Sequence, residues 1–291
     1  MWIRILIVCI VLSLVIWATF LMHNSLQWTA WFPPVALSMY SELHTSGSND
    51  IYVLRTHRWD IHIEKMWRDL CSDIGHEYVY VAYDVTGGRK LPAALVGNGH
   101  VITHTEEECK SINRIHKSLW LTFESLLVLL YQRLRRIKFQ HLWVIEYDVR
   151  CTGNWKHVLQ SAVNHCRDAD FVSYRVEEFN IARNALWAWW WNKSARRGKR
   201  SDRSVLPWRS FLPISRYSYR LLQVYDKSIG EWTDFCELYL PTRCMEESGF
   251  SCDNLSPHLV GNWYTTKAMS DKEWADGVGR PKNKLYHAIK S

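Results

Sequence analysis

The chain has 291 residues, 47% of them hydrophobic and 22% charged, which is the composition of a globular protein with a real core and allows one large domain or two small ones. Its net charge of +7 is concentrated between residues 196 and 203, which carry +4. The rest of the chain is nearly balanced, so the charge does not indicate a nucleic-acid-binding surface. The 17 Trp, 14 Tyr and 9 Phe supply flat faces that stack on sugar rings, although most are expected in the core or against a membrane.

The N-terminus contains a stretch long enough to cross a membrane as a helix. Ile5–Met22 has 18 residues and no charge. Arg4 precedes it and the next Lys or Arg is Arg55, so the positive-inside rule predicts a cytosolic tail with the rest of the chain across the membrane. A cleaved signal peptide is the alternative, disfavoured because large residues end the stretch. We therefore expect a type II membrane protein whose tail and span occupy residues 1–22.

Residues 23–50 are expected to form a stem, because they end in the polar run Thr45–Asp50. The folded region, 51–291, would then lie in an oxidising compartment where disulfides persist. Seven cysteines follow the span, and Cys244 with Cys252 is the pair that we expect to form a bridge. Glycosylation sequons begin at Asn192 and Asn254.

Strand and helix patterns alternate between residues 51 and 174. Short β-rich runs are predicted at Ile51–Leu54, Tyr78–Tyr83, Val101–Thr103, Leu142–Ile145 and Asp170–Tyr174. Helical spacing is found at Ile61–Leu70, Leu119–Leu134 and Lys156–Cys166. This order predicts an α/β fold with a mostly parallel sheet flanked by helices, whose ligands bind beyond the carboxyl ends of the strands.

The second half of the chain is less regular. An aromatic patch, Trp187–Trp191, precedes the basic loop at 194–204. Leu206–Ser215 is partly apolar and interrupted by Pro207 and Pro213, and Tyr217–Tyr225 is predicted to be helical. The basic loop is either a solvated segment or a contact for a pyrophosphate, an acidic acceptor or membrane headgroups.

Two carboxylates stand at the end of one predicted strand. Glu146 and Asp148 follow the apolar run Leu142–Ile145, and side chains two positions apart in an extended chain point to the same side. Hard oxygen ligands suit Mg²⁺ or Mn²⁺, which bridges to nucleotide phosphates. The alternative is an ordinary solvated strand end.

Several segments together resemble glycosyltransferase-like proteins of the nucleotide-sugar-binding GT-A architecture, a Rossmann-related fold. They are the N-terminal anchor and stem, Trp143–Arg150, Trp155, Phe235–Thr242 and Lys284–His287. The resemblance covers roughly residues 51–290. It implies a nucleotide-sugar-binding half at 51–174 and an acceptor-binding half at 175–291. In these enzymes an Asp-x-Asp motif binds the metal on the donor diphosphate, and Glu146-Tyr-Asp148 is similar, with Glu in first place.

The resemblance also implies a further metal ligand near the C-terminus, for which His287 is the matching residue; the alternative is an exposed tail histidine. An inverting transfer needs a carboxylate base, and Glu237 is the candidate, since it lies between apolar residues at a turn into a helix. Glu237 would otherwise be a carboxylate satisfied by a backbone amide or an Arg. Asp84 is expected to touch the nucleoside or to cap the next element.

Indole faces pack well on sugars, so Trp187 and Trp190 are the candidates for the acceptor site, with the core as their alternative location. The sequence therefore predicts a Mn²⁺- or Mg²⁺-dependent glycosyltransferase in the Golgi or endoplasmic reticulum membrane. Its catalytic domain would be lumenal, its substrates a nucleotide sugar and a glycan or glycoconjugate, and nucleic acid would not be a partner. The alternatives are a non-catalytic carbohydrate-binding or scaffold protein, a glycoside hydrolase and, last, a sulfotransferase.

Overall fold

The computed structural model describes residues 49–113, 123–180, 207–230, 235–276 and 280–290, without the side chains of 262–267. Residues 49–291 form one compact unit. In the part of the chain that is described, no helix combines the length and the apolar character that a membrane crossing requires. The span expected at Ile5–Met22, the stem up to residue 48, the aromatic patch and the basic loop lie outside the described residues.

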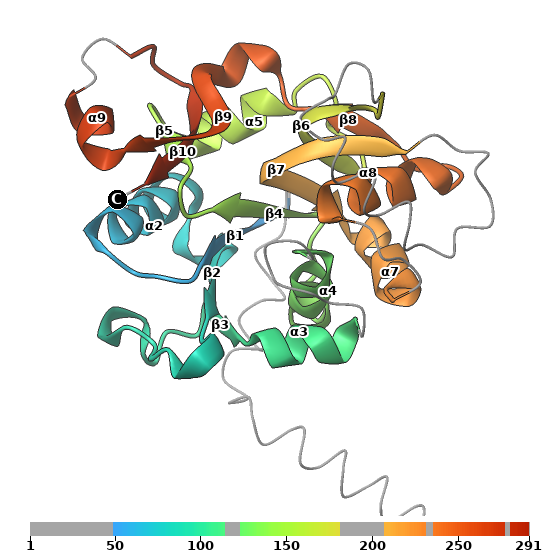
Figure 1. Ribbon diagram of the computed structural model, residues 1–291, viewed down its shortest axis with the longest axis horizontal. Helices are drawn as coiled ribbons and strands as arrows, with labels where there is room; N and C mark the ends of the chain where they lie inside the picture. Colours follow the sequence, from blue (N-terminus) through green and yellow to red (C-terminus); the bar gives the residue numbers. More distant parts are fainter. Residues whose placement is uncertain (1–48, 114–122, 181–206, 231–234, 277–279, 291) are drawn as a thin grey trace, which may run out of the picture. The chain divides into compact units, whose positions relative to one another are not determined.

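A seven-stranded sheet forms the centre of this unit, with the strand order β3-β2-β1-β4-β7-β6-β8 (Figure 1). Strands β3, β2, β1 and β4 are parallel, β7 is antiparallel to both β4 and β6, and β8 is parallel to β6. The strands are β1 (Ile51–Thr56), β2 (Val79–Asp84), β3 (Val101–His104), β4 (His141–Glu146), β6 (Phe171–Glu178), β7 (Trp208–Ser218) and β8 (Cys252–Asn254). The predicted α/β class with a mostly parallel sheet is confirmed.

Helices cover both faces of the sheet, because β1 and β4 are apolar on both sides. Val53 and Val144 pack in one core cluster with α4, α7 and α8, whereas Leu54 and Ile145 pack in another with α2 and α5. Strands buried on both faces read as continuous apolar runs, and this explains their sequences. The helices are α2 (Ile61–Ile74), α3 (Glu106–Ile112), α4 (Phe123–Leu134), α5 (Trp155–Ala162), α7 (Tyr219–Ser228), α8 (Cys236–Glu246) and α9 (Asp271–Asp276).

Several helices begin at a side chain that accepts hydrogen bonds from the exposed amides of the first turn. Asp60 Oδ1 accepts from the amides of His62 at 2.9 Å and Ile63 at 3.0 Å, and Asn154 caps α5 in the same manner. Such caps fix where α2 and α5 leave the sheet. Short 3₁₀ helices occupy His76–Tyr78, Thr86–Gly88, Ala93–Leu95 and Pro257–Leu259.

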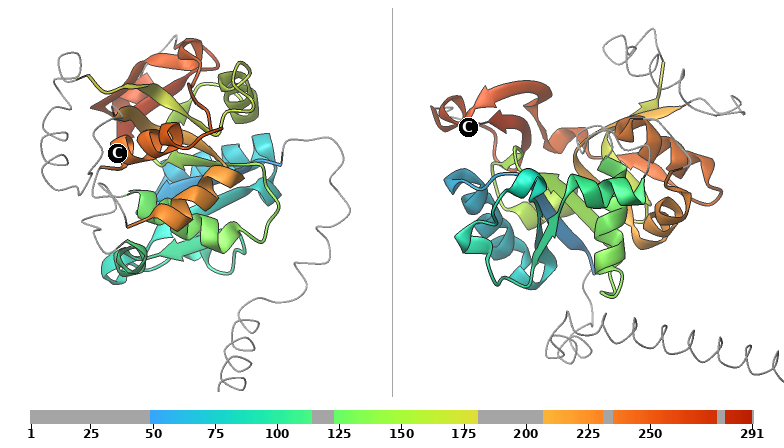
Figure 2. Two further views of the ribbon diagram at one scale, coloured as in Figure 1. Left: turned by 90° about the vertical axis from the view of Figure 1, so that its right-hand side faces the viewer. Right: turned by 60° about the horizontal axis from the view of Figure 1, so that its bottom comes forward.

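A second, three-stranded sheet joins distant parts of the chain, in the order β5-β10-β9. Its strands are β5 (Arg150–Cys151), β9 (Val260–Ser270) and β10 (Leu285–Lys290). The red C-terminal segments gather at one end of the unit in both views of Figure 2. Because β5 follows β4 directly and pairs with β10, the C-terminal strand is brought to the carboxyl end of β4.

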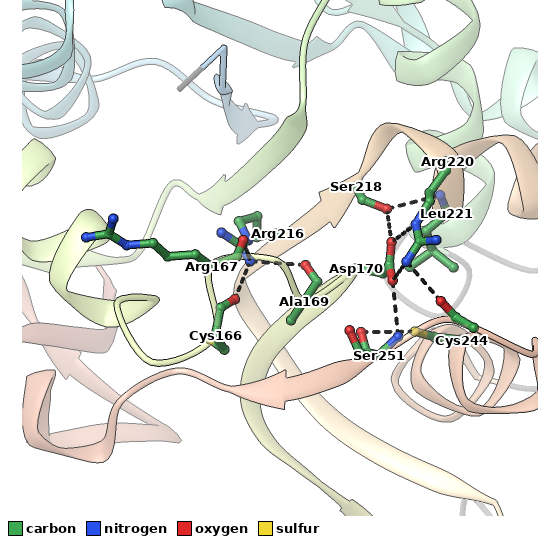
Figure 3. Close-up of polar contacts among 11 residues, drawn as sticks. Cys166, Arg167, Ala169, Asp170, Arg216, Ser218, Arg220, Leu221, Cys244 and Ser251 are labelled. Carbon is green, nitrogen blue, oxygen red and sulfur yellow. Dashed lines mark hydrogen bonds and ion pairs between the residues drawn. The ribbon is translucent and has the colours of Figure 1, made fainter. Parts of the chain in front are cut away.

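A network of polar groups around the buried Asp170 holds the β6–β8 side of the large sheet (Figure 3). Asp170, at the start of β6, accepts hydrogen bonds from Ser218 and Arg220 and from the backbone amide of Ser251. These bonds join the beginning of β6 to the end of β7 and to the segment before β8. The network thereby fixes the order of three strands whose sequence separation is large.

Candidate functional site

The acidic pair stands where sequence predicted it, at the carboxyl end of β4. Glu146 is the last residue of the strand, and its Oε1 lies 3.1 Å from Nη1 of Arg55 on the neighbouring strand β1. Asp148 follows in the turn and is only 3% exposed. Tyr147 packs instead under the guanidinium of Arg58, 4.8 Å from its ring centroid.

His287 of β10 reaches the same place. Its Nε2 lies 3.3 Å from Oδ1 of Asp148 and 3.6 Å from Oε2 of Glu146. The imidazole is 6% exposed and packs against the ring of Phe211, at 5.2 Å between centroids. The backbone amide of Ile289 donates to the carbonyl of Asp148 at 2.8 Å, which ties the two segments together. The alternative of an exposed tail histidine is therefore wrong.

The charges of the three groups depend on one another. Burial alone would lower the pKa of His287, but the close carboxylates of Asp148 and Glu146 outweigh it and raise the pKa to about 9. Burial works against the ionised form of Asp148, yet His287 and Lys290 hold the pKa of this carboxyl below its usual value. Lys290 Nζ lies 3.6 Å from Oδ2 of Asp148. Glu146 and Asp148 thus stabilise positive charge at the position that His287 occupies.

The donor set fits a hard divalent cation. Glu146, Asp148 and His287 each offer one ligand atom, and these atoms lie within 4.8 Å of one another. Oδ1 of Asp148 is buried and has no hydrogen-bond donor among the described residues, so its lone pairs are available to a ligand. Two carboxylate oxygens and one imidazole nitrogen suit Mn²⁺ or Mg²⁺ completed by water and phosphate. The structure brings the three predicted ligands together, and metal binding stays a prediction.

Arg150 holds the turn that carries Asp148. Its Nη1 donates to the carbonyls of Tyr147 at 2.8 Å and Val149 at 3.0 Å, and its Nη2 donates to Oδ1 of Asp271 at 3.2 Å. Arg150 is buried and Asp271 begins α9, so the C-terminal part of the chain braces the acidic turn. Arg55, Arg150 and Lys290 were missed from the sequence, because each has a side-chain partner far away in the chain. The only local sign was their placement within four residues of a predicted ligand or strand end.

Glu237 lies in the first turn of α8 and interacts electrostatically with the acidic corner. Burial and then the negative charge of Glu146 raise its pKa well above the ordinary value, while the Leu212 amide, His287 and Arg209 act in the opposite direction. The side chain keeps part of its surface exposed. The predicted turn into a helix is confirmed, and the role of Glu237 as a base stays a prediction.

Asp84 ends β2, as predicted, and both of its oxygens are engaged. Oδ1 accepts from the Thr86 amide at 2.8 Å and Oδ2 from Nη1 of Arg89 at 2.7 Å. Both contacts hold the turn that follows β2, where the next 3₁₀ helix has Val85 as its N-cap; capping by Asp84 and a nucleoside contact both stay predictions. Trp187 and Trp190 lie outside the described residues.

The expected disulfide between Cys244 and Cys252 is not formed. All seven cysteines after residue 48 are free thiols, and the Cys244 thiol donates to the Ser251 carbonyl at 3.7 Å. Eight residues of separation bring the two thiols near each other but do not by themselves set the geometry of a bond. The sequon at Asn254 is also engaged, because its Nδ2 donates to the Val176 carbonyl at 3.0 Å. Asn192 lies outside the described residues.

No protein-family model and no curated protein matches the sequence. Among solved structures, the chain is similar to mouse xyloside xylosyltransferase 1, with 11% identity, a TM-score of 0.41, and coverage of 82% of this chain and 97% of that one. It is also similar to a CMP:2-keto-3-deoxy-manno-octonic acid synthetase in complex with CTP, with 12% identity, a TM-score of 0.39, and coverage of 72% and 89%.

A third similar structure is core-mannan synthase A from Aspergillus fumigatus in its Mn/GDP form. It has 8% identity and a TM-score of 0.33, and the match covers 67% of this chain and 68% of that one. Similarities at this level assign the chain to no family.

Proposed function

We propose that this chain is a metal-dependent glycosyltransferase of the GT-A type, which moves a sugar from a nucleotide sugar to a hydroxyl of a glycan or glycoconjugate. The observation that supports the proposal most is the meeting of Glu146, Asp148 and His287 at the carboxyl end of β4. In open α/β sheets this is the edge where ligands bind. The buried Asp148 and the partly exposed Glu146 are held by cations and do not form a closed hydrogen-bond network.

Glu146, Asp148 and His287 would hold Mn²⁺ or Mg²⁺, which when bound neutralises negative charge on a leaving nucleoside diphosphate. Asp148 is the principal ligand of the proposal, because its Oδ1 is buried without a hydrogen bond. Arg55 holds Glu146 from β1, which leaves Oε2 directed to His287. The ammonium of Lys290 is half exposed beside Asp148 and is placed to meet a phosphate oxygen.

Glu237 would accept the proton of the acceptor hydroxyl. A carboxylate whose pKa is raised is a stronger base than an ordinary glutamate. The positive charge of Arg209 favours the ionised form that starts the reaction. Replacement of Glu237 by Gln removes the base and preserves the shape, so transfer falls about 10²- to 10⁴-fold while donor binding persists. An unchanged transfer rate in this variant would remove Glu237 from the proposal.

The remaining parts of the proposal rest on sequence. The apolar stretch Ile5–Met22 supports a type II anchor in the Golgi or endoplasmic reticulum membrane with residues 51–291 in the lumen. Trp187 and Trp190 are proposed for the acceptor site and Asp84 for the nucleoside, with residues 51–174 serving the donor and 175–291 the acceptor.

The experiment is a screen of nucleotide sugars against the purified full chain, with and without Mn²⁺. A matching donor raises the unfolding temperature by mass action, more with Mn²⁺ than without it, and is consumed when a glycan acceptor is added. Asp148→Ala should abolish both the metal-dependent stabilisation and transfer. Asp69→Ala, at a half-exposed carboxylate paired with Lys65 on α2, should change neither.

Full transfer by Asp148→Ala would contradict the proposal. Donor binding without transfer by the wild-type chain would replace it with a non-catalytic carbohydrate-binding protein.

A further inference from the structure

A second group of side chains of the types that bind metals lies near the start of β6 and in β8. His165 and Cys166 precede β6, and Asp253 is the central residue of β8. Strands β4 and β6 run in the same direction, since β7 is antiparallel to both. The start of β6 therefore lies at the sheet edge opposite the carboxyl end of β4, away from Glu146 and Asp148.

The ligand atoms of these three residues are close together. One atom from each lies within 4.8 Å of the others, and Nε2 of His165 is 3.8 Å from Oδ1 of Asp253. Cys166 is buried, whereas His165 and Asp253 are about half exposed. A tetrahedral zinc site needs ligand atoms roughly 3.5 Å apart, and rotation of the two exposed side chains closes the remaining gap.

The backbone beneath this group is fixed before any ligand arrives. Arg216, only 2% exposed, donates through Nη2 to the carbonyls of Cys166 at 2.8 Å, Arg167 at 2.9 Å and Ala169 at 3.0 Å (Figure 3). The side chain of Asn254 bonds both the amide and the carbonyl of Val176, at 2.7 and 3.0 Å, which holds β8 beside β6. The loop with Cys166 and the strand with Asp253 are thus held in register.

We propose that His165, Cys166 and Asp253 form a second metal site that binds Zn²⁺. One thiolate, one imidazole and one carboxylate are the donors that borderline zinc takes in tetrahedral sites, with water as the fourth ligand. The Glu146, Asp148 and His287 group contains no sulfur and suits harder cations. The two donor sets therefore differ in the metal they select.

Binding here requires the thiol to lose its proton. Burial, with a contribution from the charge of Asp253, raises the pKa of Cys166 to about 11, so the metal-free protein holds a thiol at neutral pH. A divalent cation reverses this balance, and its binding releases a proton.

The function of this site is to fasten an edge strand. β8 has three residues and lies at the end of the strand order, paired with β6. A metal bridge from Cys166 to Asp253 closes a long loop of chain, and cross-links of this kind stabilise the folded state. The proposal is independent of the proposed transferase, since it uses none of the same residues.

The test is a titration of the reduced, metal-free full chain with Co²⁺, whose bond to a thiolate gives a charge-transfer absorbance. We expect the band in the wild-type chain and in Asp148→Ala, and its loss in Cys166→Ser. His165→Gln, at an exposed position where the fold is not at risk, should weaken Co²⁺ binding about tenfold or more. His157→Gln, an exposed histidine on α5, is the matched control and should bind as the wild type does.

A wild-type chain without the band, or a band that survives in Cys166→Ser, would overturn the proposal. Zn²⁺ should also raise the unfolding temperature of the wild type and of Asp148→Ala, but not of His165→Gln; an equal increase in His165→Gln would count against the site. Because Asp148→Ala keeps the sulfur ligand, a failed transferase and a failed zinc site give different patterns.

Discussion

Asp170 and Asp148 are both buried aspartates, with 1% and 3% of their surface exposed, but their surroundings differ. Asp170 accepts from Ser218 Oγ at 2.6 Å, from Nε and Nη2 of Arg220 at 2.6 Å each, and from the Ser251 amide at 3.1 Å (Figure 3). Asp148 has His287 and Lys290 at 3.3 and 3.6 Å, and its Oδ1 has no hydrogen-bond donor in the described part of the chain.

The difference separates a structural carboxylate from one that can still take a ligand. A buried carboxylate with every lone pair engaged gains nothing from a metal ion, since binding would break good hydrogen bonds. A buried carboxylate held only by nearby cations exchanges them for a metal at little loss. Burial is thus the same at the two positions, and the completeness of hydrogen bonding marks the candidate site.

The largest expected effect on stability is that of Asp170→Ala. The replacement removes the acceptor of the buried Ser218 hydroxyl, of the Arg220 guanidinium and of the Ser251 amide, and we expect the free energy of unfolding to fall by about 3 kcal/mol. Asp148→Ala should lower it by no more than about 1 kcal/mol, because His287 can lose its proton when its partner is gone. Denaturant titration of both variants measures the difference. Equal losses of unfolding free energy in the two variants would mean that the difference in hydrogen bonding between Asp170 and Asp148 does not affect stability.

His104 is a further buried titratable group, and the described residues offer its ring no hydrogen-bond partner. It is 2% exposed, and neither ring nitrogen is hydrogen-bonded within the described residues. Burial lowers its pKa from 6.5 to about 4. The unfolded chain therefore binds the proton first, and stability is full above pH 6.5 and falls as the pH drops toward 4.

From pH 7 to pH 5 this group should remove roughly 2 kcal/mol of stability. In His104→Leu, which is similar in volume and cannot be protonated, that part of the acid sensitivity should disappear. The difference between the two pH–stability curves is the measurement. Parallel curves for wild type and variant would contradict a neutral, buried His104.

Variants of Arg150 test whether the turn that carries Asp148 is held in place for metal binding. Without its hydrogen bonds to the Tyr147 and Val149 carbonyls, the turn that carries Asp148 is held less firmly. Arg150→Ala should weaken Mn²⁺ binding about 10- to 100-fold, the range seen when groups that orient ligands are removed. Arg150→Lys, which can still donate to a carbonyl, should recover part of this. A folded Arg150→Ala protein with unchanged Mn²⁺ affinity would show that Arg150 serves stability alone.

The strands that could be predicted from sequence were those with a clear apolar pattern. β1, β2 and β4 are buried on both faces and read as apolar runs, so the order of strands and helices up to residue 178 could be predicted, except for α3 and β5. β7 was missed because it contains Pro213 and the buried Arg216. Pro213 falls where the pairing of β6 with β7 shifts register, and a bulge of this kind tolerates proline in an interior strand.

Arg216 is buried because it bonds three loop carbonyls, a reason that no local pattern reveals. The helix predicted at Tyr217–Tyr225 is α7, which begins later, because Ser218 ends β7 and caps the helix at Leu221. The small sheet was not predicted either, since β5 has two residues and β10 depends on distant partners.

In the candidate site, Glu146 and Asp148 were recognisable from their spacing at the end of an apolar strand. His287 came from the resemblance of a short C-terminal segment. The residues that position them, Arg55 and Arg150, could not be predicted, because their carboxylate partners Glu146 and Asp271 are brought near only by the fold. The candidate ligands could thus be predicted from sequence, whereas the residues that hold them are seen only in the structure.

The binding of Mn²⁺ to the full chain, followed by electron paramagnetic resonance alone and with UDP or GDP, tests the metal corner most directly. The wild-type chain should bind Mn²⁺ at a site that is lost in Asp148→Ala and retained in His165→Gln. Bound Mn²⁺ of equal affinity in Asp148→Ala and the wild type would contradict a metal site at Glu146, Asp148 and His287.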